Sequence, residues 1–258
     1  MKNRLLQLFV SLVLGLATSP HSFAAAAFRD DFNDGDDSGW TRYEPLAAAG
    51  APGIFSFPNG TYRIQASPSP DPASLGPGRA GTFRADQVYS DFIIAFDLVG
   101  WDNSLNQSFG TMARASASGP GSLSGYLFTY SPLGTINLSL IAGDQRTLLA
   151  SKPLSLDPSR QYYFDFEGHG RALTGGVFST DDKNNPIGFV QALDSTFTTG
   201  ENGFYLFSNT GSGAADATFD NYFAAQNVPE PSFFGLTALG GIAVFWATRF
   251  GGRRRPRS

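Results

Sequence analysis

The chain has 258 residues with a formal net charge of −4, and it contains no cysteine. The absence of cysteine excludes a disulfide framework and a thiolate metal site. Two of the 18 Lys and Arg residues lie at positions 1–26 and five at positions 228–258, whereas one of the 22 Asp and Glu residues lies in these two segments. The remaining middle part is therefore strongly acidic and would repel a phosphate backbone, so we expect no nucleic-acid partner.

Residues 1–26 have the composition of a secretory signal peptide. Lys2 and Arg4 are followed by an apolar stretch over Leu5–Ala17 and then by small residues up to Ala27. The apolar stretch is too short to span a membrane as a helix. We therefore expect signal peptidase to remove residues 1–26 and the protein to be exported through the inner membrane.

Residues 27–227 form one domain of about two hundred residues, long enough for a single sizeable core. Glycine and proline recur at intervals of roughly eight to twelve residues, and the runs between them alternate apolar and polar side chains. The predicted strands are Gly53–Phe57, Thr61–Ala66, Asp91–Val99, Phe109–Ala115, Gly125–Tyr130, Thr135–Ile141, Gln161–Glu167, Ala172–Ser179, Gly203–Phe207 and Ala217–Phe223. Ser67–Gly81, which contains four prolines, is predicted to be an extended loop. The pattern predicts an all-β, two-sheet sandwich of jelly-roll type.

An acidic cluster lies near the start of this domain. It comprises Asp30, Asp31, Asn33, Asp34, Asp36 and Asp37. Ca²⁺ takes about six to eight oxygen ligands, and clustered carboxylates repel one another in the absence of a cation. The cluster indicates either a structural Ca²⁺ site or a solvated acidic hairpin, and the domain requires no other cofactor.

Two segments carry aromatic residues suited to sugars. Trp101-Asp102-Asn103 follows a strong strand, and an indole beside an acid and an amide can stack on a saccharide and bind its hydroxyls. Tyr126 and Tyr130 alternate along one face of the predicted strand at 125–130. On an open sheet face these tyrosines would contact sugar rings, whereas on a face toward the second sheet they would be core. We favour packing for both segments and keep sugar binding as the alternative.

Asp165 and Glu167 are an i, i+2 carboxylate pair in a predicted strand. A retaining glycoside hydrolase needs two carboxyl groups about 5–5.5 Å apart. The alternative, which we expect, is a solvent-facing polar row on an outer sheet face. His169 lies in a Gly-His-Gly turn and is the one histidine beyond residues 1–26. We expect His169 to be an exposed turn residue and the domain not to be an enzyme.

Three segments resemble strands of concanavalin A-like and laminin-G-like sandwiches. Phe28–Phe32, with Asn33-Asp34-Gly35 and Trp40 after it, resembles their first strand, and Gly203–Phe207 and Ala217–Tyr222 resemble their closing strands. The resemblance implies that the first and last strands lie side by side, so that both ends of the domain meet at one edge. Sugar-binding modules, glycosidases and adhesive domains share this fold, so the fold does not choose among them.

The same resemblance implies where a Ca²⁺ ion would lie. In related sugar-binding sandwiches a structural Ca²⁺ often bridges the first and last strands. The implied ligands are Asp30, Asp31, Asn33, Asp216 and Asp220.

The last 31 residues have three parts in a fixed order. Val228-Pro229-Glu230-Pro231 precedes the apolar run Phe233–Thr248, and the chain ends in a basic tail. The arginines near its end are Arg253, Arg254, Arg255 and Arg257. The apolar run would rise about 24 Å as a helix, against a hydrocarbon core of ~30 Å. We predict a transmembrane helix over 233–250 and a cytoplasmic basic tail over 251–258.

This order of parts resembles the PEP-CTERM sorting tail of bacterial surface proteins. The resemblance implies that an exosortase, a transpeptidase-like membrane protease, cuts near Pro229-Glu230-Pro231 after the helix has anchored the chain transiently. The prolines keep this segment extended and exposed, as a protease site requires. The alternative is an ordinary C-terminal membrane anchor that is never processed.

The sequence favours a non-enzymatic, exported protein of the cell surface, envelope or extracellular matrix with a β-sandwich body. Its association with exopolysaccharide is implied by the sorting-tail resemblance alone. The alternatives are a lectin-like carbohydrate-binding module and a glycoside hydrolase that uses Asp165 and Glu167. The expected partners are signal peptidase, an exosortase-like protease, the inner membrane in transit and a polysaccharide.

Overall fold

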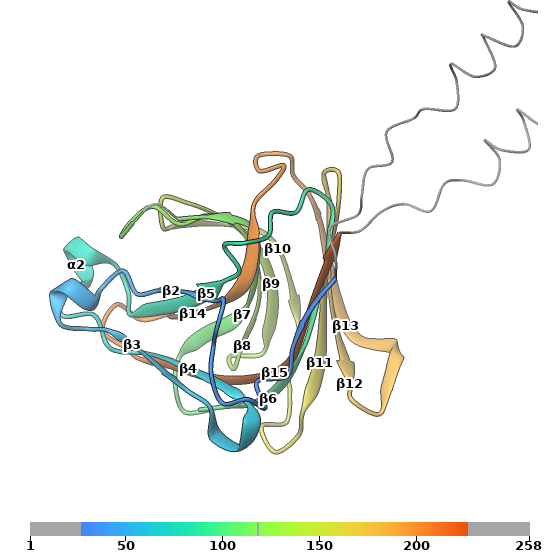
Figure 1. The fold of residues 1–258 in the computed structure, drawn as a ribbon, viewed down its shortest axis with the longest axis horizontal. Coiled ribbons are helices and arrows are strands. Elements are labelled where there is room, and N and C mark those ends of the chain that lie inside the picture. The colour runs from blue at the N-terminus through green and yellow to red at the C-terminus, as the bar shows by residue number, and fades with distance from the viewer. Residues whose placement is uncertain (1–26, 118, 227–258) are drawn as a thin grey trace, which may run out of the picture.

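Two β-sheets pack face to face in the computed structural model, which describes residues 27–117 and 119–226 (Figure 1). The eight-stranded sheet contains β1 (Phe28–Asp30), β3 (Gly53–Ser56), β4 (Tyr62–Ala66), β6 (Phe92–Trp101), β11 (Tyr162–His169), β12 (Ala172–Ser179), β13 (Asp182–Leu193) and β15 (Ala215–Gln226). The seven-stranded sheet contains β2 (Thr41–Tyr43), β5 (Arg79–Phe83), β7 (Gln107–Ser116), β8 (Ser124–Ser131), β9 (Thr135–Ala142), β10 (Gln145–Pro153) and β14 (Glu201–Ser208). The first sheet runs β13-β12-β11-β6-β15-β4-β3 with β1 beside β15, and the second runs β10-β9-β8-β7-β14-β5-β2.

All ten strands predicted from the alternation of apolar and polar residues are present, and the predicted two-sheet all-β sandwich is confirmed. The sequence does not predict the strands β2, β5, β10 and β13. Of these, β2, β10 and β13 lie at sheet edges, and β10 and β13 are exposed along most of their length, so they lack an apolar face. The prediction of a loop over Ser67–Gly81 is wrong in part, because this segment contains the turn α2 (Pro72–Leu75) and the start of β5.

The first and last described strands lie side by side, as the resemblance implies. The antiparallel pairing of β1 with β15 places Phe28 opposite Ala224 and Asp30 opposite Tyr222. Both ends of the sandwich therefore meet within one sheet (Figure 1).

The space between the sheets is filled by aromatic side chains centred on Phe204. The Phe204 ring stacks on Phe219 at 4.3 Å between centroids and on Trp40 at 5.8 Å. Stacked and edge-to-face pairs of this kind add to the burial of apolar area. A cysteine-free sandwich thus has a large aromatic core to stabilise it.

Tyr126 and Tyr130 belong to this core. Both are almost fully buried, at 0% and 1% exposure. The Tyr126 hydroxyl donates to Asp194 Oδ1 at 2.6 Å, and the Tyr130 hydroxyl accepts from the backbone N–H of Leu156 at 3.1 Å. The alternative that these two tyrosines form an open sugar-binding face is therefore wrong, because their face of β8 turns toward the second sheet.

The seven-stranded sheet is strongly curved, and its outer face is the concave one (Figure 1). A Cβ atom at Gly110 would clash with the carbonyl oxygen of Phe128, and one at Gly203 with that of Thr82. These glycines permit neighbouring backbones to approach closely on the concave face. A second apolar cluster covers this face, formed by Tyr43, Phe83, Met112, Ala115, Leu123, Leu127, Ile141, Tyr205 and Phe207.

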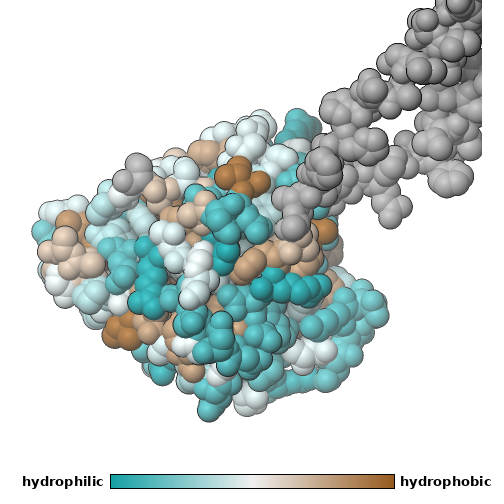
Figure 2. All heavy atoms as spheres, viewed as in Figure 1, coloured by the Kyte–Doolittle hydropathy of each residue, from teal (hydrophilic) through white to brown (hydrophobic). Residues whose placement is uncertain are grey.

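The surface shown in Figure 2 is predominantly hydrophilic, with small scattered apolar areas. Within residues 27–117 and 119–226, no helix is both long and apolar enough to cross a membrane. The predicted signal peptide at 1–26, the motif Val228–Pro231, the helix at 233–250 and the basic tail lie outside the described residues. They stay predictions.

Candidate functional site

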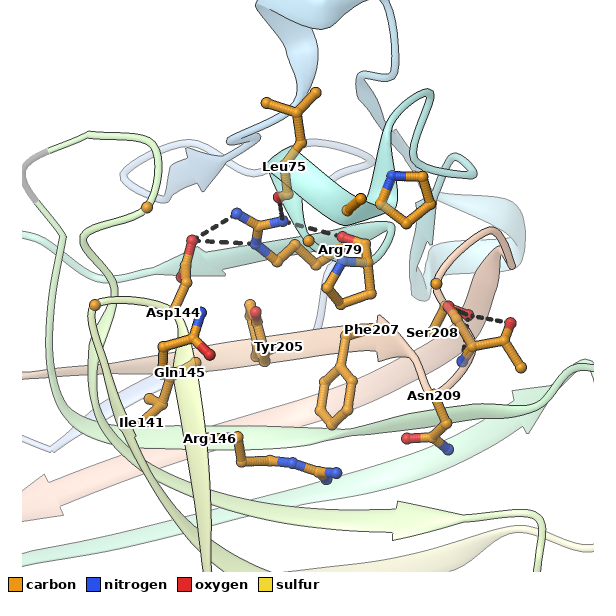
Figure 3. Close-up of a pocket in the computed structure, with 18 of the residues that line it drawn as sticks. Leu75, Arg79, Ile141, Asp144, Gln145, Arg146, Tyr205, Phe207, Ser208 and Asn209 are labelled. Atoms are coloured by element: carbon orange, nitrogen blue, oxygen red, sulfur yellow. Dashed lines mark hydrogen bonds and ion pairs between the residues drawn. The ribbon is translucent and has the colours of Figure 1, made fainter.

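A cavity of about 650 Å³ lies over the concave face of the seven-stranded sheet (Figure 3). Its floor comes from β8, β9 and β14, and its walls come from the α2 segment, the β9–β10 turn and the loop at 208–211. The volume is in the range of roughly 300–1,000 Å³ that is usual for small-molecule sites. Segments far apart in the sequence therefore enclose one ligand-sized space.

The floor of the cavity is apolar and aromatic. Leu127 on β8 and Ile141 on β9 lie beside Tyr205 and Phe207 on β14. Side chains alternate along a strand, so Tyr205 and Phe207 face the cavity while the intervening Leu206 points into the core. The two rings lie 5.7 Å apart between centroids. Both rings are nearly covered, at 2% and 7% exposure, so they form the apolar base of the cavity.

A buried ion pair closes one side of the cavity. Arg79 Nη2 lies 2.6 Å from Asp144 Oδ2, and both side chains are less than a tenth exposed. Arg79 Nη1 also donates to the carbonyl oxygens of Leu75 and Pro77, at 2.8 and 3.0 Å. The Tyr43 hydroxyl donates to the Asp144 carboxylate at 2.9 Å. Burial, with the Asp144 charge beside it, raises the pKa of Tyr43 well above its usual range, so Tyr43 stays a donor.

The turn that carries Asp144 has a defined geometry. Gly143 and Asp144 have φ values of 57° and 62°, which is the left-handed pair of a two-residue hairpin turn. An acidic residue tolerates this conformation better than most non-glycine residues. The turn therefore aims the Asp144 carboxylate back across the concave face toward Arg79.

Two polar groups face the cavity without a protein partner. The Tyr205 side chain is 2% exposed, and within the described part of the chain its hydroxyl has no hydrogen bond. Arg146 lies with its guanidinium carbon 4.7 Å from the centroid of the Phe207 ring, and no described carboxylate pairs with it. Partial burial lowers the pKa of Arg146 from its usual value, although the residue as a whole remains exposed. Arg146 is exposed at the cavity, and its guanidinium and the Tyr205 hydroxyl are the two polar groups available to a ligand there.

Amide and hydroxyl groups complete the rim. Gln145 lies at the start of β10, and Ser208 and Asn209 lie where β14 ends (Figure 3). Ser208 Oγ donates to the carbonyl of Thr210 at 2.7 Å, and Asn209 Oδ1 accepts from Ser108 Oγ at 2.9 Å. These bonds hold the 208–211 loop in place beside the aromatic floor.

The chemistry of the cavity is suited to binding. Aromatic rings beside amides, a hydroxyl and a guanidinium match a ligand that has both C–H faces and polar substituents. Among the residues that line the cavity, Asp144 carries the one carboxylate. This carboxylate already accepts hydrogen bonds from Arg79 and Tyr43. General acid–base cleavage of a glycoside uses two carboxyl groups, and the lining does not offer them.

Trp101, Asp102 and Asn103 lie elsewhere, at the end of β6. The Trp101 ring packs on Phe109 and Tyr130, at 5.9 and 5.7 Å between centroids. Trp101 Nε1 donates to Asn103 Oδ1 at 3.1 Å, so the indole is already the hydrogen-bond partner of the Asn103 amide oxygen. Trp101 and Asp102 border a separate hollow of about 310 Å³ beside the ion pair of Arg63 with Asp216. The segment thus has the packed strand-end position that we favoured, away from the larger cavity.

The five predicted Ca²⁺ ligands do not come together. Asp30 Oδ2 accepts from Trp40 Nε1 at 2.8 Å, and Asp216 is bound by Arg63, whose Nε lies 2.9 Å from Asp216 Oδ1. Among the described residues, no group of three or more His, Asp or Glu side chains is placed to hold a metal. The proposed ligand set is corrected, because the amides of the acidic segment cap its carboxylates locally and Arg63 neutralises Asp216.

Asp31 and Asn33 form a local turn, in which Asp31 Oδ1 accepts from the backbone N–H of Asn33 at 3.2 Å. Asp220 lies on β15, and burial raises its pKa, with smaller contributions from the charges of Asp97 and Asp31. Asp31 follows β1, which pairs with the strand that carries Asp220. They nevertheless belong to no described cluster of three acids.

Asp165 and Glu167 lie on the outer face of the eight-stranded sheet, away from the cavity. Asp165 is flanked by Gly176 on β12 and Ala95 on β6, and its Oδ1 has no hydrogen-bond partner. Burial raises the pKa of Asp165 to about 7, and the charge of Glu167 adds to this shift. The pair therefore occupies the outer polar row that we expected, although Asp165 itself is largely buried.

His169 ends β11 next to the β11–β12 turn and is largely exposed. Its Nδ1 lies 2.8 Å from Asp91 Oδ2, and Asp91 Oδ1 also accepts from the backbone N–H of Gly170 at 2.8 Å. The contact orders the turn at the surface. This position agrees with the exposed turn residue predicted from the sequence.

Fold and cavity define a class, an all-β sandwich that carries a ligand-sized cavity on its concave sheet. No protein-family model matches the sequence, and no curated protein matches it. Solved structures do share the fold. A carbohydrate-binding module of the CBM66 group from Bacillus subtilis superposes with a TM-score of 0.54 at 17% identity, over 73% of this chain and 96% of that one.

Two further structures are similar to this chain. The lectin UEA-II, solved with galactose, gives a TM-score of 0.52 at 11% identity, over 80% of this chain and 100% of the lectin. A prokaryotic β-1,3-1,4-glucanase derived from a mouse hindgut metagenome gives 0.54 at 11% identity, over 79% of this chain and 100% of the enzyme. At these identities the likeness establishes the lectin-like sandwich fold.

Sequence reasoning missed the residues that line the cavity. Tyr205 and Phe207 lie in a predicted strand, but their face could not be assigned. Arg146 lies in β10, which was not predicted, and Arg79 falls in the segment taken for a loop. The alternation Tyr205-Leu206-Phe207 was the one signal of an aromatic outer face, and it looks the same as a core pattern.

Proposed function

We propose that the domain at 27–226 is a carbohydrate-binding module that takes a saccharide in the cavity over the seven-stranded sheet. The observation that carries the proposal is the ligand-sized cavity itself, in which the Arg146 guanidinium, the unpartnered Tyr205 hydroxyl and amide groups gather above an apolar base. A saccharide needs donors and acceptors for its hydroxyls and an apolar surround for its C–H groups. The similarity in fold to a carbohydrate-binding module, a lectin and a glucanase supports the same conclusion.

The proposal is binding without hydrolysis. Asp144 is the one carboxylate that lines the cavity, and its ion pair with Arg79 holds it in an acceptor role. Asp165 and Glu167 lie on the other sheet's outer face, where no described cavity includes them. Incubation of the full-length protein with any glycan that it binds is expected to release no reducing sugar, and release of reducing sugar would overturn this part of the proposal.

A glycan array probed with the full-length protein tests the binding function. We expect at least one glycan to be retained, and we expect Tyr205→Phe to weaken its binding because the hydroxyl donates to the ligand. Tyr163→Phe is the matched control, since Tyr163 lies on the outer face of the other sheet. Retention by neither wild type nor control, or equal retention by all three proteins, would contradict the proposal.

We further propose that the module is exported and displayed at the cell surface. The signal-peptide pattern at 1–26 and the Pro-Glu-Pro, apolar and arginine order at 228–258 support this proposal. Mass spectrometry of the protein from the cell surface is expected to find a chain that begins near Ala27 and ends near Pro231. An intact chain in the cytoplasm would overturn export, and an intact C-terminus in the membrane would favour the ordinary anchor.

A further inference from the structure

The charges that line the cavity do not cancel. Arg79 and Asp144 neutralise each other at 2.6 Å, whereas Arg146 has no carboxylate partner among the described residues. The cavity therefore carries one uncompensated positive charge within an acidic domain. Arg146 is exposed on β10, so this charge is accessible to an anionic group of a ligand.

The position of Arg146 leaves its hydrogen-bonding groups free. Its guanidinium lies over the Phe207 ring, with 4.7 Å between the guanidinium carbon and the ring centroid. A guanidinium carries five N–H donors in its plane. The ring thus orients a fork of donors that has no protein acceptor in the described residues.

A planar fork of this kind matches one ligand group particularly well. Guanidinium binds a carboxylate through two parallel, charge-assisted hydrogen bonds, which are stronger than bonds between neutral groups. The Tyr205 hydroxyl, on the same strand as Phe207, is a second free donor at the aromatic floor. Burial raises the pKa of Tyr205 well above its usual value, so the hydroxyl keeps its proton.

Resting on the proposed function, we infer that the cavity selects an acidic saccharide, whose carboxylate pairs with Arg146 while its ring lies in the cavity between the α2 segment and the 208–211 loop. A uronic acid residue of a polysaccharide has this chemistry. Neutral sugars lack a charge that can pair with Arg146, so they bind more weakly.

The test uses the full-length protein and paired glycans that differ in the carboxylate alone. Polygalacturonate, alginate and hyaluronan are each compared with their carboxyl-reduced counterparts, in which every uronate has become a neutral sugar. We expect at least one acidic glycan to bind roughly tenfold or more tightly than its reduced counterpart. Arg146→Gln should abolish this difference, and Arg146→Lys should restore only part of it, because lysine lacks the planar fork.

Arg29→Gln is a matched control for the loss of a stacked arginine. Arg29 lies over the Phe223 ring at 4.4 Å, outside the cavity, and the variant should bind as the wild type does. If reduced and acidic glycans bind equally, the acidic inference fails while the binding function stands. If sulfated glycans bind and carboxylated ones do not, the carboxylate assignment is wrong. If none of the glycans binds, acidic or neutral, the proposed function itself is contradicted.

Discussion

Asp144 on the β9–β10 turn and Arg79 on β5 form a buried ion pair, although 65 residues separate them in the sequence. The contact spans the concave face and holds the turn over the curved sheet. Because both charges are buried, each depends on the other for its solvation. The pair therefore couples the shape of the cavity to the stability of the sandwich.

Replacing Asp144 with Asn should destabilise the protein substantially. The substitution leaves the buried Arg79 guanidinium without a counter-charge, and removal of one partner of a buried pair costs about 3–5 kcal/mol. Urea denaturation followed by tryptophan fluorescence measures the loss. Arg160→Ala is the control, because the Arg160–Asp181 pair is exposed and such pairs contribute about 0–1 kcal/mol. Equal losses in the two variants would contradict the assigned role of the buried pair.

Gly203→Ala should also destabilise the protein, through the curvature of the sheet. The added Cβ would meet backbone atoms of Thr82 and Phe83 on β5, which cannot move without opening the sheet. Overpacking of this kind costs about 1–3 kcal/mol. Gly100→Ala is the comparison, since a Cβ there meets nothing within 4 Å. Thermal melting that shows the same shift for both variants would refute the close approach at β14.

Asp165 should make stability fall as the pH rises from about 4 to about 7. Its folded pKa, raised to about 7 by burial and then by the Glu167 charge, lies above the unfolded value. In that window the unfolded chain loses its proton while the folded one keeps it, so ionisation favours unfolding. Asp165→Asn should therefore be more stable than the wild type above pH 7, and the advantage should vanish below pH 4. Urea denaturation at pH 4, 5.5 and 8 measures the difference, and a constant difference at all three values would contradict the raised pKa.

The sequence predicts the sandwich well because its central strands alternate and end at turn residues. It predicts faces poorly, since β8 offers Tyr126, Phe128 and Tyr130 on one side and Leu127 on the other. Both sides are buried, as the seven-stranded sheet is covered by apolar residues on its two faces. In such a strand the alternation of apolar and polar side chains no longer shows which face points to the core and which to solvent.

The cavity could not be predicted for a second reason. Its closing contact joins Arg79 and Asp144, and no local pattern marks either residue. The acidic segment around Asp30 and Asp31, by contrast, carries a clear pattern that led to a wrong set of calcium ligands. Its carboxylates look like calcium ligands in the sequence, but backbone N–H groups and the Trp40 indole satisfy them instead.

The most direct test of the account is isothermal titration calorimetry of two phenylalanine variants with a glycan that the wild type retains. Phe207 lies under Arg146 on the floor of the cavity. Phe189, on β13 and outside the cavity, lies under Lys152, with 4.5 Å between Lys152 Nζ and the ring centroid. Each variant thus loses a ring that stacks on a cation. The account predicts that Phe207→Ala weakens binding at least roughly tenfold, because the ring holds Arg146 in place and forms part of the cavity floor, while Phe189→Ala binds as the wild type does. Unchanged binding by a folded Phe207→Ala protein, or loss in Phe189→Ala alone, would contradict the assignment of the cavity as the sugar-binding site.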